Sequence, residues 1–247
     1  MFRKIFANIP DVTKNIVIIN VLFFLATIVA QGRGYNLHGL LGMHYPGSNY
    51  FEPYQIITHF FMHSDLMHIL FNMIGLIVFG SHLERTWGKQ RFFIFYFVTA
   101  MGAAMLHFLV QGIEIHSLTG EWFPEIFINT PKEAYSSVIN FETSFAYEEN
   151  WRMAASMYAT PTLGASGAVY GLLMAFALLF PNTQFMLLFP PIPIKAKWLA
   201  IILGGMALYQ GYQGNPDDSV AHFAHLGGML FGFILILIWR KDRNKFY

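Results

Sequence analysis

The chain has 247 residues, and its composition is that of a membrane protein. Hydrophobic residues make up 55% of it and charged residues only 12%, whereas ordinary soluble domains are roughly 25% charged. A soluble or disordered chain needs more charge than this, and a net charge of +1 gives no overall basic field that would attract nucleic acid. The chain contains no cysteine, which excludes disulfides, thiolate metal ligands and cysteine nucleophiles.

Six apolar segments recur along the chain, and we interpret each as the core of a membrane-spanning helix. Lipid offers no partner for backbone polar groups, whereas a helix satisfies its own. Basic residues precede the first segment, as in a signal peptide, but five further segments and the lack of a clear cleavage site favour a retained helix. The sequence predicts an all-α membrane protein, a six-helix bundle forming a single domain over residues 1–247. The segments are Ile16 to Ala30, Ile69 to Phe79, Phe92 to Val110, Leu163 to Phe180, Trp198 to Tyr209 and Ala221 to Trp239.

The distribution of lysine and arginine predicts the orientation of this bundle. Cytoplasmic loops of membrane proteins carry an excess of these residues. If both termini are cytoplasmic, only Arg33, Lys132 and Arg152 lie outside, and the other 12 of the 15 basic residues lie inside. The opposite orientation would invert this ratio, so we expect an even number of spans with both termini in the cytoplasm.

Two of the outside loops are long. The first, residues 31–58, contains many glycines and several prolines among apolar residues, which predicts irregular structure against the membrane interface. The second, residues 111–160, is polar and contains seven glutamates against Lys132 and Arg152. We expect this second loop to be an external insertion.

The segment Leu163 to Gly171 opens the fourth span and contains Ser166 among glycines and alanines. Pro161 would end any incoming helix, so Ser166 is expected near a helix N-terminus, where unpaired N–H groups favour negative charge. The 15 residues from Ser166 to Phe180 cover about 22 Å of helix, less than the hydrocarbon thickness of about 30 Å, so the serine would lie below the outer surface. In the competing interpretation these small residues only allow close helix packing. The elbow of soluble hydrolases fits less well, because Ala168 stands where that motif has glycine.

His225, Gly228 and Gly232 lie on one face of the sixth span, at helical positions i, i+3 and i+7. Small residues on both the fourth and the sixth spans predict that these helices pack closely, which would bring Ser166 within reach of His225. An imidazole is a suitable general base for a serine hydroxyl. The alternative is a histidine that merely bonds a backbone carbonyl in the helix interface.

His68 and Asn72 are four residues apart at the start of the second span, and both can donate hydrogen bonds to an oxyanion. A metal site is the competing interpretation, since His59, His63, His68, His222 and His225 could supply imidazoles. Against it, the helix lacks a His-Glu-x-x-His pattern and no carboxylate accompanies these histidines within a span. We therefore expect neither a metal nor another cofactor.

Together these segments resemble the rhomboid family of intramembrane serine proteases, in its bacterial six-span form. Each motif is weak alone, but their order and their positions on the spans make the combination specific, and the resemblance runs from the first span to the sixth. It rests on Gly-x-Ser-Gly at Gly164 to Gly167, His68 with Asn72, the upstream His59 and His63, Glu84-Arg85, and Ala224-His225-Leu226-Gly227-Gly228 with the spacing from Gly228 to Gly232.

The resemblance implies a role for each matching residue. Ser166 would be the nucleophile and His225 the general base, with Tyr170 stacked on the imidazole. His68, Asn72 and the backbone N–H of Ser166 would line an oxyanion hole, and Gly164 would leave room beside it. His63 and Gly228 would support the site. One departure stands out: Tyr54-Gln55 replaces the Trp-Arg of many bacterial members, which puts the arginine contacts of the first outside loop in doubt.

The function implied is hydrolysis of a peptide bond in or near a transmembrane segment of another membrane protein, through an acyl-enzyme. Because Asp217 and Asp218 lie in a loop, serine and histidine would act as a dyad. Substrates would enter beside the fifth span. The expected location is the cell membrane of a bacterium, with transmembrane proteins and the lipid bilayer as partners and the oligomeric state open. The alternative function is a rhomboid-like protein that binds membrane clients without cleaving them.

Overall fold

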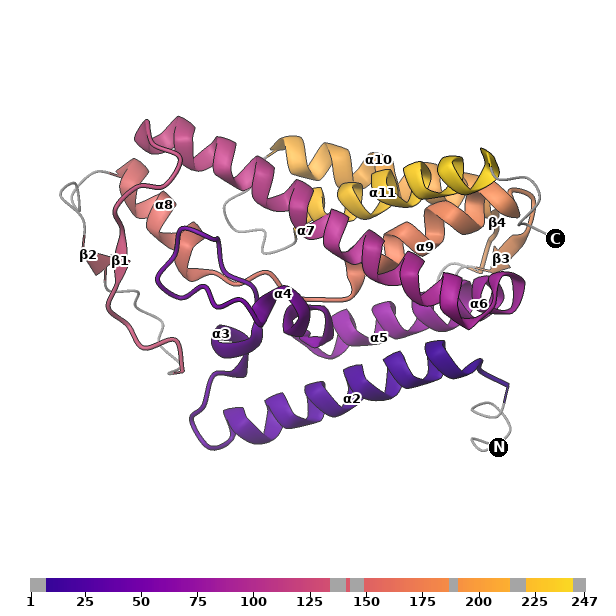
Figure 1. The fold of residues 1–247 in the computed structure, drawn as a ribbon, viewed down its shortest axis with the longest axis horizontal. Helices are drawn as coiled ribbons and strands as arrows, with labels where there is room; N and C mark the ends of the chain where they lie inside the picture. Colours follow the sequence, from indigo (N-terminus) through magenta and orange to yellow (C-terminus); the bar gives the residue numbers. More distant parts are fainter. Residues whose placement is uncertain (1–7, 134–140, 143–148, 187–190, 214–220, 242–247) are drawn as a thin grey trace. The chain divides into compact units, whose positions relative to one another are not determined.

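The computed structural model describes residues 8–133, 141–142, 149–186, 191–213 and 221–241 (Figure 1). Its contacts divide the chain into two compact units. The first unit comprises Met1–Val17, Phe71–His107 and Ser166–Tyr247, and the second comprises Ile18–Leu70 and Phe108–Ala165. Whether residues 1–247 form a single domain stays a prediction.

Each of the six apolar segments lies largely within a helical stretch of the described residues. Four stretches are long and apolar enough to cross a membrane: Asp11–Gln31, Leu66–Trp87, Lys89–Thr119 and His222–Arg240. The prediction of a helical membrane protein is confirmed, while the number of six spans and the cytoplasmic termini stay predictions. The helices are α2 (Asp11–Gln31), α5 (Leu66–Gly75), the π-helix η2 (Leu76–Gly80), α6 (Ser81–Trp87), α7 (Lys89–Thr119), α9 (Ser166–Leu179), α10 (Ala196–Gln213) and α11 (His222–Lys241).

Helix α9 forms the core of the first unit, and it packs against α11 through glycine faces. A Cβ atom at Gly228 would overlap the carbonyl oxygen of Gly167, and one at Gly232 would lie 2.9 Å from the carbonyl oxygen of Gly171. Side chains farther along α9, including Leu172 and Phe176, are buried. The two backbones can therefore approach closely only because these positions carry no side chain.

A buried carboxylate joins α6 to the start of α2 within the first unit. Glu84 is 3% exposed, and its two oxygens accept hydrogen bonds from the backbone N–H groups of Val12 and Thr13 and from the Thr13 hydroxyl, at 2.8–3.0 Å. These N–H groups belong to the first turn of α2, where they have no partner within the helix. Glu84 thus acts as a distant N-cap for α2.

The second unit contains both of the long loops that are predicted to lie outside, together with most of α2 and the first residues of α5. The first loop contributes α3 (Leu37–Leu41) and α4 (Gln55–Thr58), followed by the 3-10 turn His59–Phe61; the insertion contributes α8 (Glu149–Ala159) and the antiparallel strands β1 (Phe127–Ile128) and β2 (Phe141–Glu142). The two loops therefore fold together as parts of one unit rather than as two independent loops. Their common hydrophobic core consists of Tyr45, Tyr50, Ile115, Ile126, Ile128, Trp151, Ala154, Ala155 and Tyr158.

Hydrogen bonds also connect the two loops directly. The Asn49 side chain donates to the carbonyl of Ile128 and accepts from the N–H of Ile128, both at 3.0 Å. The Lys132 ammonium lies 3.3 Å from the Glu52 carboxylate, and the N–H of Asn36 donates to the carbonyl of Glu133. The first loop is thus bound to the insertion over much of its length.

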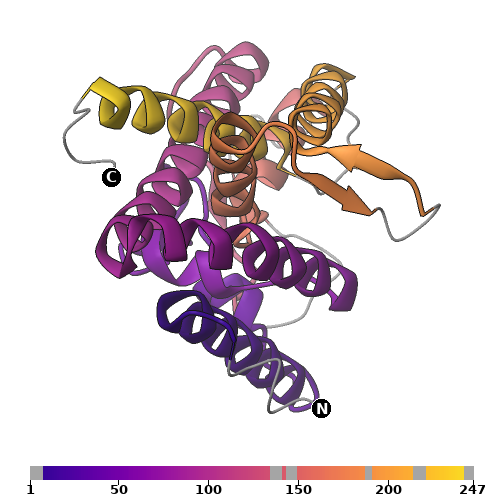
Figure 2. The same cartoon turned by 90° about the vertical axis from the view of Figure 1, so that its right-hand side faces the viewer.

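A short β-hairpin connects α9 to α10. Strands β3 (Gln184–Met186) and β4 (Pro193–Lys195) pair antiparallel, with Gln184 opposite Lys195 and Met186 opposite Pro193. The strands extend sideways from the ends of α9 and α10 (Figure 2). This hairpin is not among the elements predicted from the sequence.

Candidate active site

The side chains of Ser166 and His225 meet within the first unit. Ser166 is the first residue of α9, and His225 lies in the first turn of α11. The Ser166 Oγ lies 2.9 Å from the His225 Nε2, a distance at which the hydroxyl can donate to the ring. Both residues are half-buried. A hydroxyl next to a basic nitrogen can lose its proton as it attacks an electrophile.

The ring of Tyr170 stacks on the imidazole of His225. The two ring centroids are 4.2 Å apart and the ring planes differ by 4°. Tyr170 is four residues after Ser166, so the same face of α9 presents both the hydroxyl and the aromatic ring. This stacking restricts the rotation of the imidazole and keeps its Nε2 beside the serine.

Asn72 presents a buried donor that has no partner among the described residues. The side chain is 5% exposed, and its Nδ2 makes no hydrogen bond. One turn farther along α5, a Cβ at Gly75 would lie 2.6 Å from the Val169 side chain, which is one turn past Ser166. Because α5 and α9 run in the same direction (Figure 1), this contact puts Asn72 at about the level of Ser166. An unsatisfied buried amide is costly, and an anionic ligand would satisfy it.

The histidines before the second span belong to the second unit. The Asp65 carboxylate accepts from the backbone N–H of His68 at 2.9 Å and so caps α5. The Nδ1 of His68 lies 3.0 Å from the Ser64 hydroxyl and 3.4 Å from the Ser64 N–H, so Ser64 fixes the orientation of this ring. The ring of His63 lies 4.9 Å from that of His68.

His63 is completely buried, and its two ring nitrogens have no hydrogen-bond partner in the described part of the chain. Desolvation by burial, together with the nearby His68, lowers the pKa of His63 to about 3. The imidazole of His63 is therefore neutral at ordinary pH.

Gly164 ends the segment that leads into α9. Its φ of +115° lies in the region that L side chains rarely adopt, and its N–H donates to the carbonyl of His59 at 2.9 Å. This conformation explains why α9 begins at Ser166 rather than at Leu163, where the apolar segment begins. It leaves the first N–H groups of α9 at the serine.

The predicted site residues thus fall into two groups. Ser166, Tyr170, His225, Gly228 and Asn72 belong to the first unit, and His63, His68 and Gly164 to the second. Over the described residues, no three potential metal-ligating side chains of histidine, cysteine, aspartate or glutamate gather.

A family model described as the Rhomboid domain matches residues 50–118 and 136–242 of this chain. The chain belongs to the rhomboid family. It is 29% identical over 191 residues to RHOMBOID-like protein 12, mitochondrial, of Arabidopsis thaliana, covering 77% of this chain and 48% of that protein. It is 28% identical over 200 residues to Rhomboid protein 1, mitochondrial, of Saccharomyces cerevisiae (77% and 44%). It is 23% identical over 188 residues to Rhomboid protease AarA of Providencia stuartii (72% and 53%).

This rhomboid therefore spans about half the length of the curated relatives it matches. The resemblance seen in its motifs is confirmed, and the chain is a multi-pass membrane protein of a family that includes proteases.

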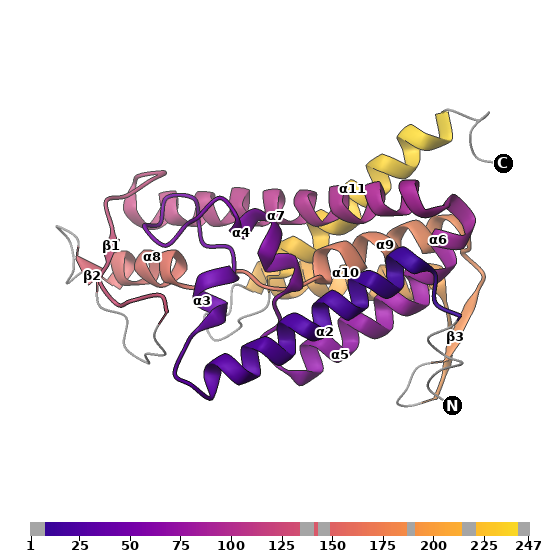
Figure 3. The same ribbon diagram turned by 60° about the horizontal axis from the view of Figure 1, so that its bottom comes forward.

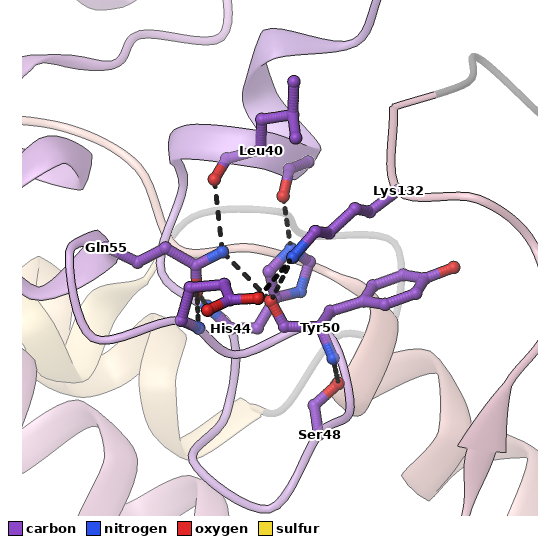
Figure 4. Close-up of polar contacts among 8 residues, drawn as sticks. Leu40, His44, Ser48, Tyr50, Gln55 and Lys132 are labelled. Atoms are coloured by element: carbon purple, nitrogen blue, oxygen red, sulfur yellow. Dashed lines mark hydrogen bonds and ion pairs between the residues drawn. The ribbon is translucent and has the colours of Figure 1, made fainter.

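Gln55 holds the first outside loop of this rhomboid together. Its side chain is fully buried. The oxygen Oε1 accepts from the N–H groups of His44 and Glu52 at 3.3 and 3.1 Å, and the Nε2 group donates to the carbonyls of Leu40 and Tyr50 at 3.2 and 3.0 Å (Figure 4). The amide thus uses its full hydrogen-bonding capacity.

Neither these contacts of Gln55 nor the capping role of Glu84 is predicted from the sequence. Gln55 bonds only backbone groups, which are present in every sequence and carry no signal. The only local sign of this role is that the polar Gln55 directly precedes the apolar Ile56 and Ile57.

Proposed function

We propose that this rhomboid is an intramembrane serine endopeptidase that hydrolyses a peptide bond in or near a transmembrane segment of other membrane proteins. The observation that carries the proposal is the 2.9 Å contact between Ser166 Oγ and His225 Nε2. Family membership supports it, since relatives such as AarA of Providencia stuartii are named rhomboid proteases.

In the proposed mechanism, His225 Nε2 accepts the Ser166 proton while Oγ bonds to the scissile carbonyl carbon. The tetrahedral intermediate collapses as the imidazolium gives this proton to the leaving amine, and an acyl-enzyme remains. His225 then takes a proton from a water molecule that attacks the ester, and returns it to Ser166. Tyr170 keeps the imidazole oriented throughout by stacking on it.

Three donors are proposed to stabilise the oxyanion. The Nδ2 of Asn72 is buried with no partner in the described residues, the His68 ring would offer one of its N–H groups, and the N–H of Ser166 lies at the N-terminus of α9. Such donors stabilise charge that develops only in the transition state. Gly164 would leave room beside them for the substrate backbone, while the buried His63 and Gly228 would support the site.

We propose that substrates are transmembrane proteins entering beside α10, whose Trp198 and Ile201 are exposed. A substrate helix has to unwind before its carbonyl reaches a serine, so residues that destabilise helices are expected near the cut. The proposed location is the inner membrane of a bacterium, and the bacterial relative AarA supports it, whereas other relatives carry the word mitochondrial in their names.

Labelling of the purified protein with a fluorophosphonate probe tests the proposed nucleophile. The wild type should react and the Ser166→Ala variant should not, because the probe forms a bond with an activated serine oxygen. His225→Ala should abolish cleavage of a model transmembrane substrate. Labelling that survives in Ser166→Ala contradicts the proposal. Binding of membrane clients without any cleavage by the wild type would instead favour a non-proteolytic client-binding protein.

A further inference from the structure

The β3–β4 hairpin exposes large apolar side chains. Met186 is 65% exposed and Ile192 is 53% exposed, and Phe185, Pro191, Pro193 and Ile194 complete the described part beyond the base. No charged residue occurs in residues 185–186 or 191–194. A surface of this kind in water is an aggregation liability, so it marks contact with an apolar partner.

The base of the hairpin is held firmly against the helices of the first unit. The ring of Phe185 packs 5.2 Å from that of Phe176 and 5.4 Å from that of Phe79. The N–H of Ala196 donates to the carbonyl of Thr183 at 2.8 Å. The direction in which the hairpin extends is therefore set by the ends of α9 and α10.

That direction is sideways. Figure 2 shows β3 and β4 leaving the helix ends laterally, and Figure 3 shows β3 at a steep angle to α9 and α10. A hairpin that continued along the helices would enter water. This hairpin extends sideways at the level where the membrane helices end. It would therefore lie along the membrane surface.

Polar and aromatic residues mark this level as the membrane interface. Gln184 and Lys195 form the pair at the base of the hairpin, and the Lys197 ammonium lies 5.6 Å from the centre of the Trp198 ring. Tryptophan is enriched at the depth of the lipid headgroups, and lysine extends its ammonium toward the phosphates. Basic residues also concentrate on the leaflet that is rich in anionic lipids.

We propose that the β3–β4 hairpin is a membrane anchor that lies in the interface of the bilayer. Met186 and Ile192 insert among the acyl chains, and Lys195 and Lys197 contact the phosphates of anionic phospholipids. The occupant of the apolar surface is therefore lipid, continuous with the lipid around the exposed side of α10. The anchor would hold the beginning of α10 at a fixed depth.

Spin-label accessibility tests this proposal, and the absence of cysteine allows single-site labelling. Met186→Cys and Ile192→Cys would carry a nitroxide in nanodiscs of phosphatidylethanolamine and phosphatidylglycerol. Leu208→Cys, on the exposed side of α10, is the control for lipid, and Glu149→Cys, exposed on α8, is the control for water. Collisions with oxygen and with a water-soluble nickel chelate would be compared.

Labels at 186 and 192 should collide with oxygen far more than with nickel, as the label at 208 does. Nickel access equal to that at 149 would mean that the hairpin lies in water and would overturn the proposal. Protection from both reagents would mean that protein, such as a second copy of this chain, covers the hairpin, and would overturn it as well.

The role of the lysines is tested separately. Replacing phosphatidylglycerol by phosphatidylcholine should raise nickel access at 192 in the otherwise unchanged protein. The double variant Lys195→Gln and Lys197→Gln should respond equally in both lipids, because the charges that attract phosphate are gone. A lipid dependence that persists in this variant would overturn the phosphate contacts.

Discussion

The unpaired amide of Asn72 lowers the stability of the fold, and this loss of stability points to a role in the reaction. Its Nδ2 is buried without a partner in the described residues, whereas Gln55 has a partner for every polar position. A buried donor left unpaired lowers stability by about 1–3 kcal/mol. Such a donor suits a function in which its partner appears only during the reaction.

Replacement of Asn72 by alanine should therefore separate activity from stability. We expect Asn72→Ala to lower kcat by about 10²- to 10³-fold, the usual value of one oxyanion donor. The Tm should stay unchanged or rise, because no hydrogen bond of Nδ2 is lost. Cleavage rates and thermal unfolding in detergent measure the two effects. A fall in Tm that parallels the loss of rate would assign Asn72 a structural role instead.

His63 should make the fold sensitive to acid. Its pKa falls from 6.5 to about 3 on folding, so between these values the unfolded chain binds more protons than the folded one. The stabilisation is complete above about pH 6.5 and is lost as the pH falls toward 3, by at most about 1.4 kcal/mol per pH unit. In denaturant unfolding at pH 7 and pH 4.5, His63→Phe should lose less stability than the wild type. Equal losses would show that His63 does not titrate in this way.

At the scale of elements, two buried side chains each bond backbone groups outside their own helix. Glu84 of α6 caps α2, and Gln55 of α4 ties together backbone groups of the first outside loop. The sequence predicts the helices themselves, because a run of apolar residues is a local property. It does not predict these ties, since Glu84 and Thr13 are 71 residues apart.

Loss of the Glu84 cap should destabilise the junction between α2 and α6. Glu84→Ala removes three hydrogen bonds to a carboxylate, each worth about 1.5–3 kcal/mol, while Glu84→Gln retains an acceptor and should cost less. Asp11→Asn is the control, because the ion pairs of Asp11 are exposed and exposed pairs contribute little to stability. Thermal unfolding should rank the Tm values as wild type, Asp11→Asn, Glu84→Gln, Glu84→Ala, in falling order. Equal Tm values for Glu84→Ala and Asp11→Asn would refute the cap.

Replacement of Gln55 should loosen the first outside loop. Gln55→Leu has a similar size but removes the Gln55 partner of two N–H groups, those of His44 and Glu52, and of the Leu40 carbonyl, while the Tyr50 carbonyl keeps Lys132 as a donor. Hydrogen exchange should accelerate at the amides of His44 and Glu52, which donate to Gln55. The amide of Ser48 donates instead to the carbonyl of Tyr45 and is the internal reference for this local effect. Unchanged exchange at His44 and Glu52 would show that the Gln55 amide does not hold the loop.

At the scale of the whole molecule, the apolar helices can be predicted from the sequence because lipid requires apolar, self-bonded segments. Structure that depends on contacts between distant parts of the chain cannot be predicted in this way. The glycines of α9 and α11 predict close packing of these helices, and Ser166 and His225 lie 2.9 Å apart. The shape of the insertion does not follow from its sequence, because its strand β1 and Asn49 are 79 residues apart along the chain. The β3–β4 hairpin escaped prediction because its apolar residues extend the pattern of the adjoining spans.

The shared core of the outside loops also limits how this rhomboid can be altered. Tyr45 and Tyr50 from the first loop pack with Ile126, Ile128 and Trp151 from the insertion. A chimera that received a short loop from a more compact relative would leave both tyrosines uncovered, even with every apolar span intact. The two loops can therefore be shortened, exchanged or grafted only as a matched pair.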